Sequence, residues 1–272
     1  MAIVWMNGKW QEESAGGIQL NDRGLLLGCA AFETMHAIDG HVIHLEKHRA
    51  RLASTIIAMS LPAIEPLDLL DVIHLLCQKN NCASGHARIR LTVTAGEGAL
   101  GDPRPGKNAT TWLSAHAFTP SHEPMSAILL PWRRNEHSPL SGMKTASYAE
   151  NLLAKRWAQQ QGFDEGIFLN TAGNLCEATT SNLFIVKQQT LYTPDLASAC
   201  LPGVMRDVVL EYATRMSIPC QSTTLPASML DDADELFLTS ALHGIIPVNR
   251  LANRIITTQG RITASLQELD DF

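Results

Sequence analysis

The sequence predicts an α+β protein built from two domains. Its 272 residues are enough for two domains of ordinary size. Short strand-like and helix-like stretches alternate in both halves of the chain, which is typical of α+β folds. A short proline-containing stretch, TPSHEPM at residues 119–125, separates two strand-like segments and is the best candidate for a linker. We therefore expect a smaller N-terminal domain at residues 1–120 and a larger C-terminal domain at residues 121–272.

The N-terminal part begins with a predicted hairpin. Residues 29–45 favour strands, and the Asp39–Gly40 pair between two short apolar runs indicates a tight turn. Two helices follow, at about residues 44–61 and 67–80, because apolar residues recur there every three or four positions. Residues 86–96 then alternate apolar and polar side chains, and this period predicts a half-buried strand. A further strand is expected at residues 111–118.

The C-terminal part begins with a strand at residues 126–132 and a helix at about residues 147–161. Two strands, GIFLN and SNLFIVK, are expected to be joined through a turn at Gly173. A helix from Gly203 to about Met216 carries an apolar stripe that ends in Met216, and the segment ELFLTS at residues 235–240 reads as a strand.

The composition points to a small-molecule partner. Lysine and arginine number 21 against 27 aspartate and glutamate, so the net charge of −6 argues against nucleic acid and acidic membranes as partners. The first residues lack the pattern of a signal peptide, and no apolar run reaches the roughly 18 residues of a membrane span. Six scattered cysteines without a C-x-x-C pair suit reduced, buried thiols. We expect a cytoplasmic protein.

Two motifs resemble binding sites but have simpler explanations. His41, His44 and His48 lie close together in the sequence, but the zinc motif H-E-x-x-H requires a glutamate directly after its first histidine, and Glu46 comes one place too late. We assign no metal site. The glycine-rich stretch TAGEGALGDP at residues 94–103 does not lead into a helix, as a phosphate-binding loop should. We expect a mobile surface loop or active-site loop, and the order of residues 94–108 stays open.

Four separate segments carry the candidate chemistry. Lys144 lies among small and hydroxyl-bearing residues, which solvate an ammonium poorly and favour a nucleophilic amine. Glu177 lies among small residues ahead of a strand, where a carboxylate requires a cationic partner. The helix that starts at Gly203 offers free backbone amides to an anion, and the small residues at 239–241 could add donors to the same anion.

A nucleophilic amine, a carboxylate that needs a cation and a phosphate site match the three handles of pyridoxal 5'-phosphate (PLP): its aldehyde, its ring nitrogen and its phosphate. Independent segments of the chain meet this specific demand. PLP is therefore the expected cofactor.

The order of these segments and their residue sequences resemble those of the class IV, or fold type IV, PLP-dependent aminotransferases. This family includes branched-chain aminotransferases, D-amino-acid aminotransferases and aminodeoxychorismate lyases. The resemblance covers nearly the whole chain and implies a two-domain fold type IV enzyme and a homodimer. It is carried by the motifs LNDRGLLLG, FETMHAIDG, HLEKHRARL, GFDEGIFLN, CEATTSNLF, LYTP, LPGVMRD and IIPV.

The resemblance also implies roles for individual residues. Lys144 matches the Schiff-base lysine and the group that moves the substrate's α-proton. Glu177 matches the partner of the ring nitrogen, and Arg51 matches a phosphate-binding arginine. The remaining matches are Tyr148 near the cofactor phenolate, Leu201 against the pyridine ring, the amides of Val204 and Met205 at the phosphate, and Ser240 and Ala241 in a second phosphate loop.

Within the family, SALHGIIPV and the compact length look most like aminodeoxychorismate lyases, which release pyruvate and form 4-aminobenzoate in folate synthesis. Two departures lie near the expected substrate position: residues 28–30 read Gly-Cys-Ala where many members have Gly-Asp-Gly, and residues 100–102 read Leu-Gly-Asp where lyases often have Arg-Gly-Tyr. A transaminase acting on branched-chain or D-amino acids is the alternative. A non-enzymatic or zinc-binding protein on the same fold is a remote one.

Overall fold

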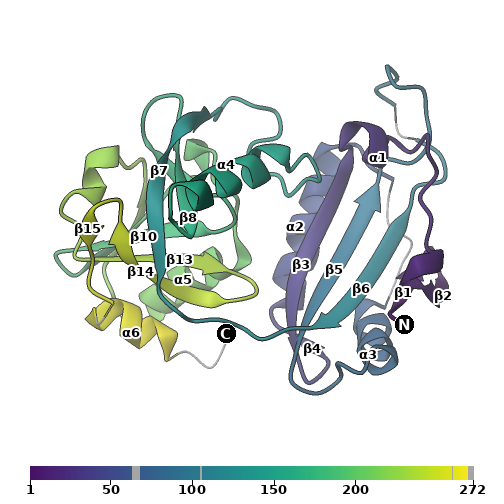
Figure 1. Ribbon diagram of the computed structural model, residues 1–272, viewed down its shortest axis with the longest axis horizontal. Coiled ribbons are helices and arrows are strands. Elements are labelled where there is room, and N and C mark those ends of the chain that lie inside the picture. Colours follow the sequence, from purple (N-terminus) through teal and green to yellow (C-terminus); the bar gives the residue numbers. More distant parts are fainter. Residues whose placement is uncertain (63–67, 105, 259, 269–272) are drawn as a thin grey trace. The chain divides into compact units, whose positions relative to one another are not determined.

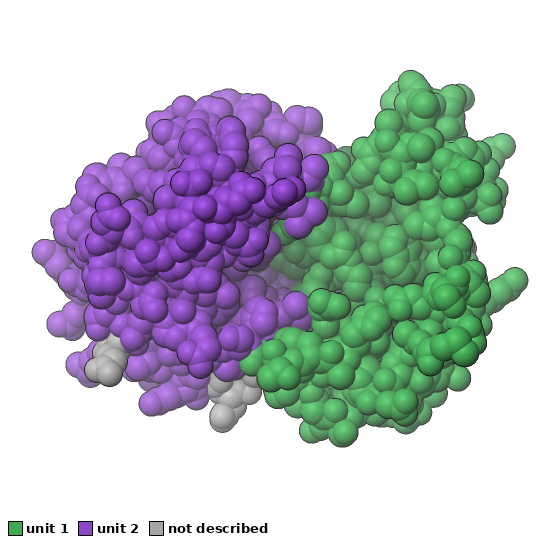
Figure 2. Space-filling model, in the orientation of Figure 1, with its two compact units in different colours: residues 1–120, 143–148 green, residues 121–142, 149–272 purple. Residues whose placement is uncertain are grey.

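The computed structural model describes residues 1–62, 68–104, 106–258 and 260–268. Its contacts divide the chain into two compact units (Figures 1 and 2). Unit 1 contains residues 1–120 and 143–148, and unit 2 contains residues 121–142 and 149–272. The expected C-terminal domain, 121–272, therefore differs from unit 2 by the short segment Met143–Tyr148, which packs with unit 1 and carries Lys144.

Unit 1 is an antiparallel sheet of six strands in the order β2-β1-β6-β5-β3-β4. Helices α2 and α3 pack against it, α2 on β3 and α3 on β6 and β1. The strands are β1 (Ile3–Met6), β2 (Lys9–Glu12), β3 (Ala30–Ile38), β4 (His41–Val42), β5 (His86–Thr94) and β6 (Thr111–Ala117). The helices are α1 (Arg23–Leu27), α2 (Leu45–Ala58) and α3 (Leu69–Lys79).

The period-2 pattern of β5 sets the two faces of this sheet. Ile89, Leu91 and Val93 are buried in the core of unit 1 together with residues of α2 and α3. The alternate positions place His86, Arg88 and Arg90 on the opposite face. The expected hairpin is confirmed, because residues 39 and 40 both have positive φ, 50° and 78°, between paired β3 and β4.

Unit 2 contains a mixed sheet of nine strands in the order β12-β11-β10-β13-β14-β7-β8-β9, with β15 paired to β14. Its strands are β7 (Met125–Arg134), β8 (Glu165–Asn170), β9 (Leu175–Ala178), β10 (Asn182–Lys187), β11 (Thr190–Pro194), β12 (Cys220–Thr223), β13 (Glu235–Ser240), β14 (Gly244–Leu251) and β15 (Arg254–Ile255). Its helices are α4 (Ala149–Gln160), α5 (Val204–Arg215) and α6 (Arg261–Gln267).

The sheet of unit 2 separates two apolar clusters. Leu183 and Ile185 of β10 pack in one cluster with residues of β8, β9 and β14. The alternate residue Phe184 stacks on Phe237 of β13, with ring centroids 4.9 Å apart, and packs with residues of α5 and α6. Successive side chains of β10 thus serve opposite faces, which makes the start of this strand a junction between the sheet and α5.

The strongly periodic helices and strands lie where the sequence predicts them. The predicted start of the second helix at residue 67 lies outside the described residues. One connection was wrong: the turn at Gly173 leads from β8 to β9, and β10 is a separate strand that pairs with β11 and β13. Met216 was also assigned wrongly to the apolar stripe of α5, since it follows the last helical residue and is 56% exposed.

No helix in the described part of the chain combines the length and apolar character needed to cross a membrane.

Candidate active site

Lys144 lies beside the first residues of β3 in unit 1. The backbone N–H of Phe32 donates to the carbonyl of Lys144 at 3.1 Å, and the N–H of Ala146 donates to the carbonyl of Ala30 at 2.8 Å. The segment therefore continues the antiparallel sheet for a short distance, with a single bridge between Ala31 and Thr145. This pairing holds the backbone of the half-buried Lys144 in one place.

The ring of Phe32 gathers three polar side chains. The Nζ of Lys144 lies 4.6 Å from the ring centroid, and the guanidinium carbon of Arg90 lies 3.4 Å from it. Tyr148 meets the same ring edge-on, with centroids 5.7 Å apart. Cations are attracted to the face of an aromatic ring. Phe32 thus places the candidate nucleophile, a second cation and a phenol in one neighbourhood.

Arg90 is a functional candidate that the sequence reasoning missed. Its hydrogen bonds within the described residues go to the hydroxyls of Thr34 and Thr92, at 3.2 and 3.4 Å, and it has no ion pair there. Burial lowers the pKa of its guanidinium to about 10, although Tyr148 and Glu33 act in the opposite direction. Arg90 remains charged at neutral pH and can receive an anion near Lys144. Only its polar position in an alternating strand could have marked it.

Arg51, the predicted phosphate ligand, forms a buried ion pair in unit 1. Its Nε and Nη2 donate to the two oxygens of Glu33 at 2.8 and 2.7 Å, and His48 Nδ1 lies 2.8 Å from the same carboxylate. Burial acts to raise the pKa of Glu33, but hydrogen bonds from Arg51 and His48 outweigh it and hold that pKa at about 2. Burial lowers the pKa of His48, assisted by the charges of Arg51 and Lys144.

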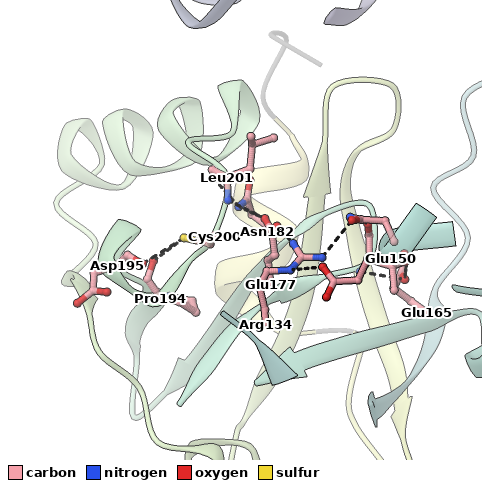
Figure 3. A network of polar contacts seen from close by, with 11 residues as sticks. Arg134, Glu150, Glu165, Glu177, Asn182, Pro194, Asp195, Cys200 and Leu201 are labelled. Atoms are coloured by element: carbon pink, nitrogen blue, oxygen red, sulfur yellow. Dashed lines mark hydrogen bonds and ion pairs between the residues drawn. The ribbon is translucent and has the colours of Figure 1, made fainter. Parts of the chain in front are cut away.

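Glu177 lies on β9 of unit 2 and has the cationic partner that its surroundings require. Arg134, at the end of β7, donates from Nη1 to Glu177 Oε1 at 2.5 Å (Figure 3). The guanidinium of Arg134 lies over the ring of Phe168, 4.1 Å from its centroid, and also donates to Asn151 at 3.2 Å. Arg134 was missed from the sequence, since a pair of arginines at a strand end is an ordinary surface pattern.

The second oxygen of Glu177 receives two further donors. The backbone N–H of Leu201 donates to Oε2 at 2.8 Å, and Asn182 Nδ2 donates to it at 3.3 Å. Figure 3 shows these groups gathered around the carboxylate. The predicted residues Glu177 and Leu201 are therefore in direct contact, although the contact is made by the backbone amide of Leu201.

The amino end of α5 presents Val204 and Met205, both buried. The first amides of a helix have no partner within the helix, and no side chain caps α5. Across the β10–β13 pair, Asn182 lies directly opposite Thr239, so the two side chains share one face. The hydroxyl of Thr239 is buried without a hydrogen-bond partner. It directly precedes Ser240 and Ala241, the predicted second phosphate loop.

The predicted site residues thus form two groups. Unit 1 holds Lys144, Tyr148 and Arg51, linked through Phe32, Glu33 and His48. Unit 2 holds the rest, around Glu177 and the amino end of α5. The histidines of the rejected zinc motif have other contacts: His48 binds Glu33, and His41 Nδ1 lies 3.0 Å from the carbonyl of Asp39.

The loop at residues 94–108, apart from residue 105, is attached to unit 1 by specific hydrogen bonds. Glu97 and Lys107 exchange both backbone hydrogen bonds, at 2.7 and 2.9 Å. The buried Arg23 donates to the carbonyls of Asp102 and Arg104 at 2.5 and 2.9 Å. The Glu97–Lys107 pair therefore closes the base of the loop, and Arg23 at the start of α1 holds its middle part.

Comparison with known proteins gives full-length matches. The family model for class IV aminotransferases matches residues 30–251. A protein of Methanocaldococcus jannaschii, provisionally named a branched-chain-amino-acid aminotransferase, is 35% identical over 97% of this chain and 94% of its own length. The aminodeoxychorismate lyase of Bacillus subtilis is 28% identical over 98% of this chain and 93% of its own.

Among solved structures, a protein from Legionella pneumophila that is provisionally named 4-amino-4-deoxychorismate lyase superposes with a TM-score of 0.86. It is 27% identical, and the match covers 94% of each chain.

Proposed function

The chain belongs to the class IV aminotransferase family, a family of enzymes that depend on PLP, and on that premise we propose that it is an aminodeoxychorismate lyase. Such an enzyme releases pyruvate from aminodeoxychorismate and forms 4-aminobenzoate. The observation that carries the proposal is the end of β13 and the turn after it, which read Ser240-Ala241-Leu242 where branched-chain enzymes usually have Gly-Thr. Full-length similarity to two proteins named as lyases supports it.

Two observations indicate that the residues of unit 2 suit PLP. The amino end of α5 lacks a side-chain cap, and the buried hydroxyl of Thr239 beside it has no partner, so an anion there would receive unused donors. Glu177 is buried and held by Arg134 and the Leu201 amide, as an oriented carboxylate for a ring nitrogen should be.

We assign the handles of PLP accordingly. Lys144 would hold the aldehyde and Glu177 the ring nitrogen. The phosphate would take the amides of Val204 and Met205, with Ser240 and Ala241 from the second loop. Arg51 would add directed hydrogen bonds rather than net charge, because Glu33 balances it. Leu201 would pack on the ring and Tyr148 would lie near the phenolate.

The protein side chains then divide the work of the reaction. Bound PLP supplies the electron sink for the substrate's α-carbon. The amine of Lys144 would remove the substrate's α-proton and return it. Arg90, a half-buried cation that shares the Phe32 ring with Lys144, would bind a substrate carboxylate and orient the α-carbon toward Nζ. Glu177, which Arg134 holds in place, would bind the ring nitrogen of PLP.

A transaminase is the second candidate. The relative with 35% identity is provisionally named a branched-chain-amino-acid aminotransferase, and both reactions use the same cofactor-binding residues. The discriminating experiment supplies aminodeoxychorismate alone and measures pyruvate and 4-aminobenzoate. The lyase forms both without a 2-oxo acid. Turnover that requires an amino acid donor together with a 2-oxo acid would reject the lyase in favour of the transaminase.

The role of Lys144 is tested by Lys144→Ala. The variant should fold, lose the visible absorbance that borohydride fixes to the protein, and lose nearly all turnover. Lys9→Ala, which removes an exposed lysine from β2, is the matched control and should behave as the unmodified protein. Normal turnover by Lys144→Ala would exclude the assignment.

A homodimer and a cytoplasmic location complete the proposal. Helix α4 buries its small residues Ala154 and Ala158 and leaves Leu152 and Leu153 61% and 63% exposed, which suits a surface covered by another chain. All six cysteines are free thiols, as in a reducing compartment. Sedimentation should give a dimer that Leu152→Glu with Leu153→Glu dissociates; a monomeric unmodified protein would contradict this part.

A further inference from the structure

Asn182 connects the carboxylate of Glu177 to the chain that leads into α5. Its side-chain amide is buried and donates to Glu177 Oε2 at 3.3 Å and to the carbonyl of Leu201 at 2.9 Å. The N–H of Leu201 donates to the same carboxylate oxygen at 2.8 Å. The Glu177 carboxylate, the main chain of Leu201 and the Asn182 amide therefore form a closed ring, and Figure 3 shows the three residues together.

Gly203 accommodates the other side of Asn182. A Cβ placed on Gly203 would overlap Asn182 Oδ1 and lie 3.1 Å from its Cγ. The backbone of Gly203 has φ −70° and ψ 136°, which any residue can adopt. The conformation therefore does not require glycine at this position. Glycine is required here because the Asn182 side chain approaches the N-cap of α5 too closely to leave room for a Cβ.

The backbone of Asn182 pairs with a third segment, the end of β13. In the β10–β13 ladder it pairs with Thr239, whose buried hydroxyl has no partner and which leads into Ser240 and Ala241. One residue thus contacts the carboxylate, the amino end of α5 and the end of β13. These are the three segments of unit 2 to which the proposed function assigns the ring nitrogen and the phosphate of PLP.

We propose that Asn182 is a positioning residue that sets the separation between Glu177 and the amino end of α5, so that one cofactor can use both. The inference rests on the proposed function and extends it. Both N–H groups of the amide are used, so its loss leaves the Leu201 carbonyl and one Glu177 oxygen short of a donor. Glu177 can then turn toward Arg134, away from the position that serves the ring nitrogen.

The first experiment measures PLP binding to the full-length protein after removal of the cofactor. Asn182→Ala should raise the dissociation constant of PLP about tenfold or more, which corresponds to about 1.4 kcal/mol. It should also shift the pH at which the visible spectrum of the bound cofactor changes, since that pH reports the surroundings of the ring. Glu177→Gln should raise the dissociation constant only a little further when Asn182→Ala is already present, because Asn182 acts through Glu177.

A matched control separates positioning from stability. Asn80 also bridges main-chain groups, accepting from the N–H of Ile3 at 2.7 Å and donating to its carbonyl at 2.8 Å, but it lies in unit 1 directly after α3. Asn80→Ala should alter the free energy of unfolding and leave PLP affinity and the spectral pH unchanged. If Asn182→Ala does not fold, Asn182→Ser replaces it and should show the same shifts with smaller size.

The second experiment is a double-mutant cycle with Gly203. Gly203→Ala should weaken PLP binding strongly when Asn182 is present and only slightly beside Asn182→Ala, because the overlapping atoms are then gone. Additive effects in this cycle, or an unchanged affinity and spectral pH in Asn182→Ala, would overturn the inference. Failure of the unmodified protein to bind PLP would instead reject the proposed function, so the two failures are distinguishable.

Discussion

Among the described residues, unit 1 contains the pair Glu33–Arg51 and unit 2 the pair Glu177–Arg134, both largely shielded from solvent and built differently. In unit 1, Arg51 donates one hydrogen bond to each of the two carboxylate oxygens of Glu33. In unit 2, Arg134 binds one oxygen of Glu177, and the other oxygen accepts from a backbone amide and from Asn182. The first geometry confines the arginine, whereas the second orients the carboxylate. The same two residue types therefore form ion pairs of different geometry, because different strands and helices bring them together.

Breaking the Glu33 pair should have the largest effect on stability. Glu33→Ala leaves Arg51, whose side chain is 9% exposed, without its carboxylate. Removing one partner of a buried ion pair costs about 3–5 kcal/mol. Chemical denaturation should measure a loss of this size. A loss below about 1 kcal/mol would mean that the Arg51 guanidinium finds another partner.

Acid should reveal the same pair through its titration. Because the pKa of Glu33 falls from its ordinary 4.5 to about 2, its stabilisation is complete above pH 4.5 and is lost as the pH falls from 4.5 toward 2. The difference corresponds to about 3 kcal/mol. Chemical denaturation at a series of pH values should show that the free energy of unfolding depends more steeply on pH in the unmodified protein than in Glu33→Gln. Parallel curves would contradict the depressed pKa.

Lysine substitutions should separate the two geometries. Arg51→Lys cannot reproduce two parallel hydrogen bonds and should lower the free energy of unfolding by about 1.5–3 kcal/mol. Arg134→Lys can keep its single contact with Glu177 and should lose about 1 kcal/mol. The comparison is made by denaturation of both variants in one buffer. Equal losses would show that the second hydrogen bond of Arg51 to Glu33 adds nothing to stability.

An exposed pair on α2 provides the smallest effect and the baseline. Glu46 and Arg49 form an ion pair at 3.0 Å with side chains 79% and 53% exposed. Glu46→Ala should alter the free energy of unfolding by about 0.5 kcal/mol or less, because water screens such pairs. A loss comparable to that of Glu33→Ala would show that burial does not govern these pairs.

Much of the fold could be predicted from local patterns. The helix periods at α2, α3, α4 and α5, the alternation of β5 and the Asp39–Gly40 turn depend on neighbours in the chain, so short windows contain the information. Strand β9 was missed, because it is short and its four residues are buried without an alternating pattern. Residues 143–148 were placed with the wrong unit, since their pairing with β3 is not a local property.

By itself, the sequence determined the family, because the motifs that carry the resemblance are contiguous. It also singled out Lys144 and Glu177 as candidates, because their small neighbours solvate a charge poorly. It also required a cation for Glu177, since burying a carboxylate without one is costly. Only the tertiary structure decided that this cation is Arg134, 43 residues away, and that Asn182 fills the space left by Gly203. Such choices depend on which strands pair and how closely their side chains approach, and no local pattern contains that information.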